Sequence, residues 1–352
     1  MRVIPPITIT EAMLTGSSVV ETPPAFYAAG TTYGAGVTSC TGVVGGTLTV
    51  YKSLAASNIG NTPATSPTWW QNIGTTYSVY SAGVTYALGD TVIDPVNHLV
   101  YESQIAGNVG QPLATGTAWL KLRGMTNKWN AFDQLRNTQT VAPVDIVQTV
   151  SPGVRVNSIA VIGLDARSVT IEVRVAGALK YKVTVNLSKR KSRTLTQYFF
   201  GGFPMRTSVQ FFNLPPYRNA DITVTVSKPT GQRGVGGILV GNAIYIGDTQ
   251  YNPESNHLNF SGVERDKFGN IDLNPRRSVP TVSEQIWFDK KLTSTILELR
   301  EALNGRPAIY SGLDDFTHDY FDPLFLFGIH KEFSVNLAQH DYGIISLQVE
   351  EL

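Results

Sequence analysis

The sequence has one cysteine, few charged residues and almost no net charge, and each shortage excludes a class of protein. Cys40 is the single cysteine among 352 residues, so the chain forms no internal disulfide and lacks the partner thiols of a structural zinc site. Charged residues make up 16% of the chain, below the about 25% of an average domain. The 28 Lys and Arg residues nearly balance the 27 Asp and Glu residues. Such a chain has no overall field to hold nucleic acid or an anionic membrane.

Long apolar stretches are also missing. The first ten residues, Met1–Thr10, include one arginine and two prolines and contain no apolar run of the length that a secretory signal needs. No run of about 18 apolar residues, the length of a membrane-spanning helix, occurs in the chain. We therefore expect a soluble protein that does not use the secretory route.

Glycine, proline and aromatic residues are plentiful instead. The chain has 32 Gly, 19 Pro, 15 Tyr, 15 Phe and 5 Trp, a mixture typical of strands joined by turns. A hydrophobic content of 42% excludes a disordered chain, and the low charge excludes a long coiled coil. Because domains mostly contain roughly 100 to 200 residues, we expect two or three of them, with one barrel-sized domain as the alternative.

An internal repeat occupies the N-terminal third of the chain. The segment Tyr27–Gly36 recurs as Tyr80–Gly89. A second set of residues, which includes Trp69 and Trp119, then recurs at an offset of 50. Each copy of about 45 residues is too short for a large core, so aromatic rings must supply most of its buried area. We predict two small, turn-rich units of two or three strands each. The residues of the second set are Tyr51, Asn58, Gly60, Ala64, Thr65 and Trp69, matched with Tyr101, Asn108, Gly110, Ala114, Thr115 and Trp119.

The middle of the chain, residues 127–247, is a series of short segments in which apolar and polar residues alternate. These segments are rich in Val, Ile and Thr and are separated by Gly, Pro and Asn. The pattern predicts an antiparallel, jelly-roll-like β-sandwich. The predicted strands are 158–164, 169–175, 181–187, 208–214, 222–226 and 237–245.

The C-terminal part, residues 248–352, combines one clear helix with strands. Asp289 is placed to cap the start of a helix over Lys290–Leu303, and Gly305 follows its end. The strand-like runs 285–288 and 307–311 flank it, which predicts a βαβ unit extended by antiparallel strands in an α+β domain. The apolar residues at helical spacing are Leu292, Ile296, Leu299 and Leu303. The later predicted strands are 324–327, 333–337 and 344–349.

Both repeats resemble the small aromatic carbohydrate-binding modules appended to bacterial chitinases. The second copy carries the resemblance in Gly83–Asp90, Val100–Ser103, Gly107–Gly110 and Trp119, and the first copy carries it in Val50–Ser53 and Ala56–Trp70. Together the copies cover about a quarter of the chain. The resemblance implies glycan binding. The acidic stretch of the second copy is replaced by a glycine-rich stretch in the first, which leaves open whether the first copy retains more than the scaffold.

The layout of the whole chain resembles a family of tailed-bacteriophage virion proteins. This resemblance implies a place in the tail or its appendages. The motifs that carry it, besides the modules, are Ile9–Leu14, Asn127–Asp133, Leu214–Tyr217 and Asp266–Asn270. The implied organisation is a lead segment (1–26), two carbohydrate-binding-module-like repeats (27–78 and 79–126), the β-sandwich (127–247) and the α+β terminal domain (248–352).

Sugar recognition requires flat apolar rings that face solvent, because the C–H faces of a pyranose stack on aromatic rings. The candidate glycan-binding residues are Trp69, Trp70, Trp119, Tyr33 and Tyr86. The alternative is that such rings form the cores of units too small to have another core, and we favour it for Trp69, Trp119, Tyr51 and Tyr101. Since neighbours in a strand point to opposite faces, one of Trp69 and Trp70 is expected to be more exposed. We align Trp70 with Leu120 of the second copy and therefore take it as the candidate ligand contact.

Catalytic and metal sites have little support in the sequence. Asp314, Asp315, Asp319 and Asp322, with His318, form the densest carboxylate cluster, and a glycosidase would need two of them on opposite sides of a bond. Runs of this type usually mark a solvated loop, so we predict no enzymatic activity. The five histidines lack metal-ligand spacing. The basic run 189–193 is read as a solvated hairpin tip rather than a nucleic-acid site.

These observations predict a non-enzymatic structural component of a bacteriophage tail. The predicted partners are other virion tail proteins and further copies of the chain in a symmetric homo-oligomer, with a host-surface glycan as a further candidate. We predict no nucleic-acid partner, no membrane insertion, no metal and no cofactor. The protein would be part of the virion, assembled in the host cytoplasm. We assign the terminal domain, with its helix and its run Leu324–Gly328, to attachment within the tail. The alternative is a glycan-binding module protein of a chitin- or polysaccharide-degrading system.

Overall fold

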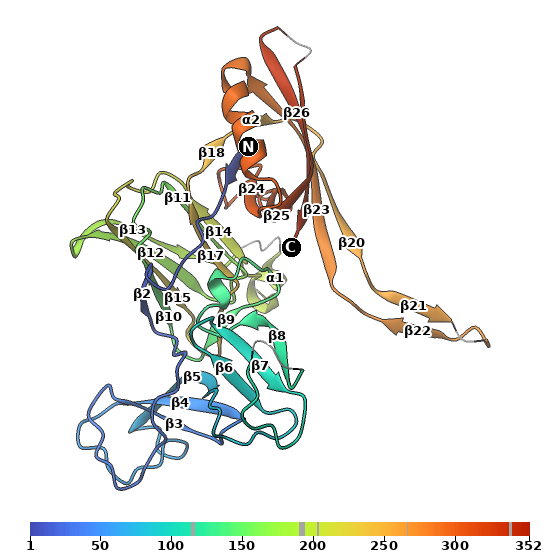
Figure 1. Cartoon of the computed structure of the whole chain (residues 1–352). Helices are drawn as coiled ribbons and strands as arrows, with labels where there is room; N and C mark the ends of the chain where they lie inside the picture. The colour runs from blue at the N-terminus through green and yellow to red at the C-terminus, as the bar shows by residue number, and fades with distance from the viewer. Residues whose placement is uncertain (114–116, 190–193, 203, 266, 338–339) are drawn as a thin grey trace.

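Figure 1 shows the computed structural model of the chain, an elongated molecule in which three strand-rich regions follow one another. The structure describes residues 1–113, 117–189, 194–202, 204–265, 267–337 and 340–352. It is mainly β, with two small aromatic β repeats, an antiparallel sandwich and a C-terminal α+β region that contains one clear helix. The predicted fold class is therefore confirmed.

The two repeats form one six-stranded sheet in the order β3-β4-β5-β6-β7-β8. Each copy contributes three antiparallel strands, and a parallel pairing of β5 with β6 joins the copies. The prediction of two or three strands per copy is confirmed. The strands are β3 (Thr38–Thr41), β4 (Thr47–Ser53), β5 (Trp70–Val79), β6 (Thr91–Asp94), β7 (Leu99–Ser103) and β8 (Trp119–Met125).

The sandwich consists of a five-stranded sheet, β13-β12-β15-β10-β2, and a three-stranded sheet, β14-β11-β17. In β15 every second side chain from Ala220 to Val226 is buried, which is the period of a strand with one face on a core. A short β9–β16 pair and the 3-10 helix η1 (Asn130–Phe132) complete the region. Its strands are β2 (Leu14–Ser17), β9 (Thr140–Ala142), β10 (Ile146–Val150), β11 (Ser158–Ile162), β12 (Ser168–Val175), β13 (Ala178–Asn186), β14 (Ser208–Phe211), β15 (Ala220–Ser227), β16 (Arg233–Val235) and β17 (Gly237–Gly241).

The terminal domain is built on an eight-stranded sheet in the order β18-β1-β24-β25-β26-β23-β19, with β20 paired to β23. Every pairing in it is antiparallel, so the predicted βαβ unit is wrong. Two of the predicted strands are parts of the single long strand β25. The strands are β1 (Arg2–Ile4), β18 (Ile244–Tyr245), β19 (Asp248–Thr249), β20 (Glu254–Asn259), β21 (Gly262–Arg265), β22 (Ile271–Asn274), β23 (Ser278–Asp289), β24 (Ala308–Ser311), β25 (Phe325–Asn336) and β26 (Tyr342–Glu351).

The predicted helix is present as η2 (Lys290–Leu292) followed by α2 (Thr293–Ala302). Asp289 caps it by accepting a hydrogen bond from the Lys291 backbone N–H at 2.9 Å. Ile296 and Leu299 are buried against the sheet, in one core with Ile286. A further 3-10 turn, η3 (Asp322–Leu324), precedes β25.

The lead segment contributes strands to two regions. Its strand β1 lies between β18 and β24 of the terminal domain, whereas β2 pairs with β10 of the sandwich. Ile4 also belongs to a small core in which Ala160 and Leu239 of the sandwich contact Phe325 and Phe327 of the terminal domain. The run that we expected to attach the protein within the tail, residues 324–328, is therefore buried inside the molecule and offers no attachment surface.

Glu21 of the lead segment ties the repeats to the sandwich. Its buried carboxylate accepts hydrogen bonds from Thr126 Oγ1 at 2.7 Å and from Trp129 Nε1 at 3.1 Å, and lies 2.9 Å from His98 Nδ1. The His98 ring stacks on Trp129, with ring centroids 4.1 Å apart. Cys40 is buried in the neighbouring core of the first repeat, and burial raises the pKa of its thiol.

Candidate functional site

Each repeat contains a cluster of three aromatic rings. In the first repeat Tyr27, Tyr33 and Trp70 have ring centroids 5.0 to 6.0 Å apart. In the second repeat Tyr80, Tyr86 and Trp119 adopt the same stacked and edge-to-face arrangement at 5.2 to 6.2 Å. Such ring pairs stabilise a small core beyond the area that they bury.

The same hydrogen-bond frame holds both clusters. The Asn58 carboxamide donates to Ser53 Oγ at 3.1 Å, and Asn108 donates to Ser103 Oγ at 2.9 Å. The Tyr86 hydroxyl accepts from the Ser81 backbone N–H at 2.9 Å, and burial raises its pKa. Side-chain amides thus complete turns that would otherwise leave buried polar groups unpaired.

The structure corrects the alignment of the two repeats by one residue. Trp70 Nε1 donates to the Asn61 carbonyl at 2.8 Å, as Trp119 Nε1 donates to the Gln111 carbonyl at 3.0 Å. Trp70 is therefore the counterpart of Trp119. The Asn58 and Asn108 carboxamides likewise reach the carbonyls of Trp69 and Ala118. The match of Trp70 with Leu120 was wrong.

Four of the five candidate sugar contacts lie in these cores. Tyr33, Tyr86, Trp70 and Trp119 have exposed fractions of 7%, 1%, 2% and 6%. As expected, one ring of the adjacent tryptophan pair is more exposed, but it is Trp69, which is half-buried, and not Trp70. The choice of Trp69 as a core ring and of Trp70 as the ligand contact was therefore wrong. A buried ring has no free face for a pyranose, so Trp69 is the candidate that still offers one.

The aspartate cluster lies on the loop that follows β24. Asp314 forms an ion pair with Arg2 at 2.8 Å, and Asp322 forms one with Lys189. Asp315 accepts hydrogen bonds from the Thr317 hydroxyl and backbone N–H, which lower the pKa of its carboxyl group. These carboxylates thus neutralise cations and close a turn. Within the described ranges, no three His, Cys, Asp or Glu side chains gather closely enough to hold a metal ion.

A two-stranded ribbon projects from the sheet of the terminal domain (Figure 1). It continues β20 and the start of β23 into the hairpin β21–β22, in which Val263 lies opposite Leu273 and Arg265 opposite Ile271. Because side chains alternate between faces, these four share one face, and Glu264 occupies the other. Val263, Ile271 and Leu273 are each more than half exposed. The ribbon therefore carries an apolar face that no part of the described chain covers.

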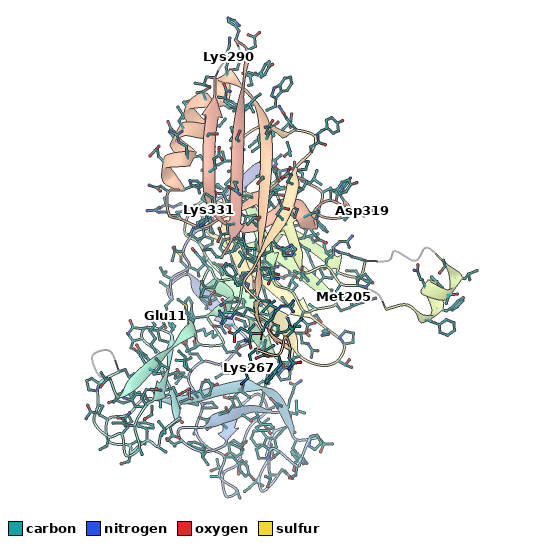
Figure 2. The ribbon with its side chains drawn as sticks, turned by 90° about the vertical axis from the view of Figure 1, so that its right-hand side faces the viewer. Glu11, Met205, Lys267, Lys290, Asp319 and Lys331 are labelled. Carbon is teal, nitrogen blue, oxygen red and sulfur yellow. The ribbon has the colours of Figure 1, made fainter. Side chains whose placement is uncertain are left out.

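The short helix α1 (Leu195–Phe200) is a second projection, held away from the sandwich in Figure 2. Thr194 caps it by accepting from the Gln197 backbone N–H at 3.2 Å. Leu195, Phe199 and Phe200 are 76%, 66% and 86% exposed. Most of the basic run 189–193 precedes the helix and lies outside the described residues, apart from Lys189.

Sequence reasoning missed both projections. The ribbon had a local signal, because Ile271 and Leu273 alternate with Asp272 and Asn274 directly after the turn-forming run Asp266–Asn270, and Val263 precedes that run. In that turn Gly269 adopts a φ of +85°. The sequence gives no comparable signal for α1, because a helix of 6 residues is too short to show a periodicity.

Comparisons with protein families, curated proteins and solved structures found no match for this chain. None of the helices in the described part of the chain is long and apolar enough to cross a membrane.

Proposed function

We propose that this chain is a non-enzymatic structural subunit of a bacteriophage tail, present in several symmetric copies. The observation that carries the proposal is the uncovered apolar face of the β21–β22 ribbon, formed by Val263, Ile271 and Leu273. We propose a phage tail as the assembly because the overall layout of the chain resembles that of tailed-bacteriophage virion proteins.

Physical reasoning favours a neighbouring subunit as the cover of this face. An isolated two-stranded ribbon is marginally stable in water, and it gains stability when its apolar face packs on another surface. Exposed apolar patches on a folded protein usually mark an interaction surface. In a closed ring of copies, each ribbon packs on the next subunit and no face remains open. The exposed Phe199 and Phe200 of α1 are equally suited to pack on a neighbouring subunit.

The absence of enzymatic activity is part of the proposal. It is supported by the engagement of Asp314 and Asp322 in ion pairs and of Asp315 in a turn, which leaves this cluster without a free pair of carboxylates. A glycosidase needs one such pair, with the two carboxyl groups about 5 to 10 Å apart across the sugar bond.

Binding of a host-surface glycan is the second part of the proposal. The resemblance of the repeats to carbohydrate-binding modules supports it, and the half-buried Trp69 is the candidate contact among the predicted residues. A glycan-binding component of a polysaccharide-degrading system remains the alternative function, because the same resemblance supports it.

Locating the protein in a purified virion tests the structural role. We expect mass spectrometry of purified particles to detect the chain in a fixed ratio to the tail-tube protein. Antibody labelling should place it on the tail in electron micrographs. A chain that is missing from particles and is found with a secreted chitinase would refute the proposal in favour of the alternative.

A further inference from the structure

The sheet of the terminal domain has two different faces. On one face, side chains such as Ile286 and Phe288 pack in a core with Ile296 of α2. On the opposite face, Gln285 and Trp287 of β23 are exposed. Figure 2 looks at these strands from the side away from α2. The face without α2 is therefore accessible to a ligand.

Polar side chains cross this open face in rows. Strand register places Glu254, Ser283, Gln348 and Glu332 opposite one another across β20, β23, β26 and β25. The next row along the strands is Gln285, Ser346 and Ser334. Adjacent strands lie about 4.8 Å apart, so these groups present hydrogen-bond donors and acceptors at a regular spacing. Within the described chain, the carboxamides of Gln285 and Gln348 have no hydrogen-bond partner.

Aromatic rings border the polar rows. Trp287 follows Gln285 on the same face, is 48% exposed and contacts the Tyr342 ring at a centroid distance of 4.4 Å. On the other side, Tyr251 is 99% exposed. The next residue, Asn252, adopts a φ of +66°, a conformation that Asn accepts more readily than most residues. This turn presents the Tyr251 ring at the rim.

A cavity of about 470 Å³ lies between Tyr251 and these rows. Its volume falls within the roughly 300 to 1,000 Å³ of typical ligand sites. Glu254 and Glu332 present carboxylates to it, and the described residues that line it include no lysine or arginine. The side chain of Glu284 lies on the opposite, buried face of β23. Anionic ligands are disfavoured by this charge, whereas neutral or cationic ones are accepted.

We infer that this cavity binds an oligosaccharide of neutral or amino-bearing hexoses. Tyr251 at the cavity, and Trp287 beyond Gln285 on the same face of the sheet, supply apolar platforms for the C–H faces of successive sugars. The carboxamides, serines and carboxylates of the cavity pair with hydroxyl and amino groups. The inference rests on the proposed glycan-binding role and moves its site from the repeats to the terminal domain. A protein partner is less suited to the cavity, because interface cores are depleted in glutamate and serine.

Calorimetric titration of the full chain tests the site with three probes: the glucosamine hexamer, the N-acetylglucosamine hexamer and the galacturonic acid hexamer. We expect the first two to bind and the third to fail. Tyr251→Ala and Trp287→Ala should each weaken binding about tenfold, since a lost ring contact is worth about one factor of ten. Both side chains are exposed, so circular dichroism should show an unchanged fold.

Tyr217→Ala is the matched control, because it removes an aromatic ring of the sandwich that is 43% exposed and should leave the affinity unchanged. The variant E254Q/E332Q should reduce the preference for the glucosamine hexamer over its acetylated form. The inference is overturned if neither hexamer binds, if the galacturonic acid hexamer binds best, or if Trp69→Ala removes binding while Tyr251→Ala does not. Each of these results leaves the position of the protein in the tail, tested separately in virions, unaffected.

Discussion

Trp129 donates a hydrogen bond from its indole Nε1 to the buried carboxylate of Glu21 at 3.1 Å, across 108 residues of sequence. The carboxylate also accepts from Thr126, lies beside His98 and is 3.7 Å from Lys128 Nζ. One side chain of the lead segment thus satisfies polar groups of both the second repeat and the first turn of the sandwich region. This contact fixes how the repeats join the rest of the molecule.

Removal of the Glu21 carboxylate should therefore loosen that junction. In Glu21→Ala the Trp129 indole and the Thr126 hydroxyl lose their acceptor while they remain buried, and breaking such a network costs about 3 kcal/mol or more. We expect a lower denaturation midpoint, monitored by tryptophan fluorescence. The exposed Glu11→Ala should change stability by less than about 0.5 kcal/mol. Equal effects of the two substitutions would contradict the role of Glu21.

Truncation of the two adjacent tryptophans should reduce the stability of the first repeat by very different amounts. Trp70 fills the core of the first repeat, so Trp70→Ala should destabilise that repeat by about 3 to 5 kcal/mol. Trp69→Ala removes a half-buried ring and should cost far less. Thermal unfolding followed by near-ultraviolet circular dichroism separates the two. A larger loss in Trp69→Ala would reverse the assignment of core and surface.

The sequence predicted the two three-stranded repeats but not the residue-by-residue alignment of one copy with the other. The aromatic residues and the Asn and Gly turn positions identified two three-stranded units. The segment between Asn108 and Trp119 is one residue shorter than the segment between Asn58 and Trp70. An alignment based on identical residues therefore matched Trp119 with Trp69 instead of Trp70. The register became visible only through the indole hydrogen bonds to Asn61 and Gln111.

Pairings between distant segments explain most of the other differences. The strand β1 lies beside β24, whose residues are more than 300 positions away, and no local pattern in Arg2–Ile4 specifies that partner. The predicted βαβ unit failed for a related reason. The helix and its flanking strands were found correctly, but their relative direction is set by β25 and β26, which lie between β24 and β23 in the sheet.

The buried carboxyl group of Glu284 should make stability depend on pH. Burial raises its pKa to about 7 from 4.5, although Thr249 donates to it at 3.1 Å and the Met1 amino group lies near. Between these values the folded state holds a proton that the unfolded state has released. Stability from this group is thus complete below about pH 4.5 and is lost as the pH rises through about 7, by roughly 3 kcal/mol in total.

Glu284→Gln should remove this pH dependence, because its carboxamide has no proton to release. Unfolding free energies measured from pH 5 to pH 8 should fall with pH in the original chain and fall less steeply in the variant. The exposed Glu298→Gln serves as the control and should retain the original slope. If Glu284→Gln retained it as well, the dependence would come from another group.

The apolar face of the ribbon should determine self-association. Leu273 is 65% exposed, so Leu273→Asp costs the isolated subunit little, but it places a charge at the centre of the proposed contact. Burial of an unpaired carboxylate in an interface is strongly unfavourable, and the oligomer should dissociate. Glu264→Gln alters the opposite face of the same hairpin and should leave assembly intact. Light scattering coupled to size-exclusion chromatography measures both masses. A monomeric original chain, or an oligomer that survives Leu273→Asp, would show that the ribbon does not join copies of this protein.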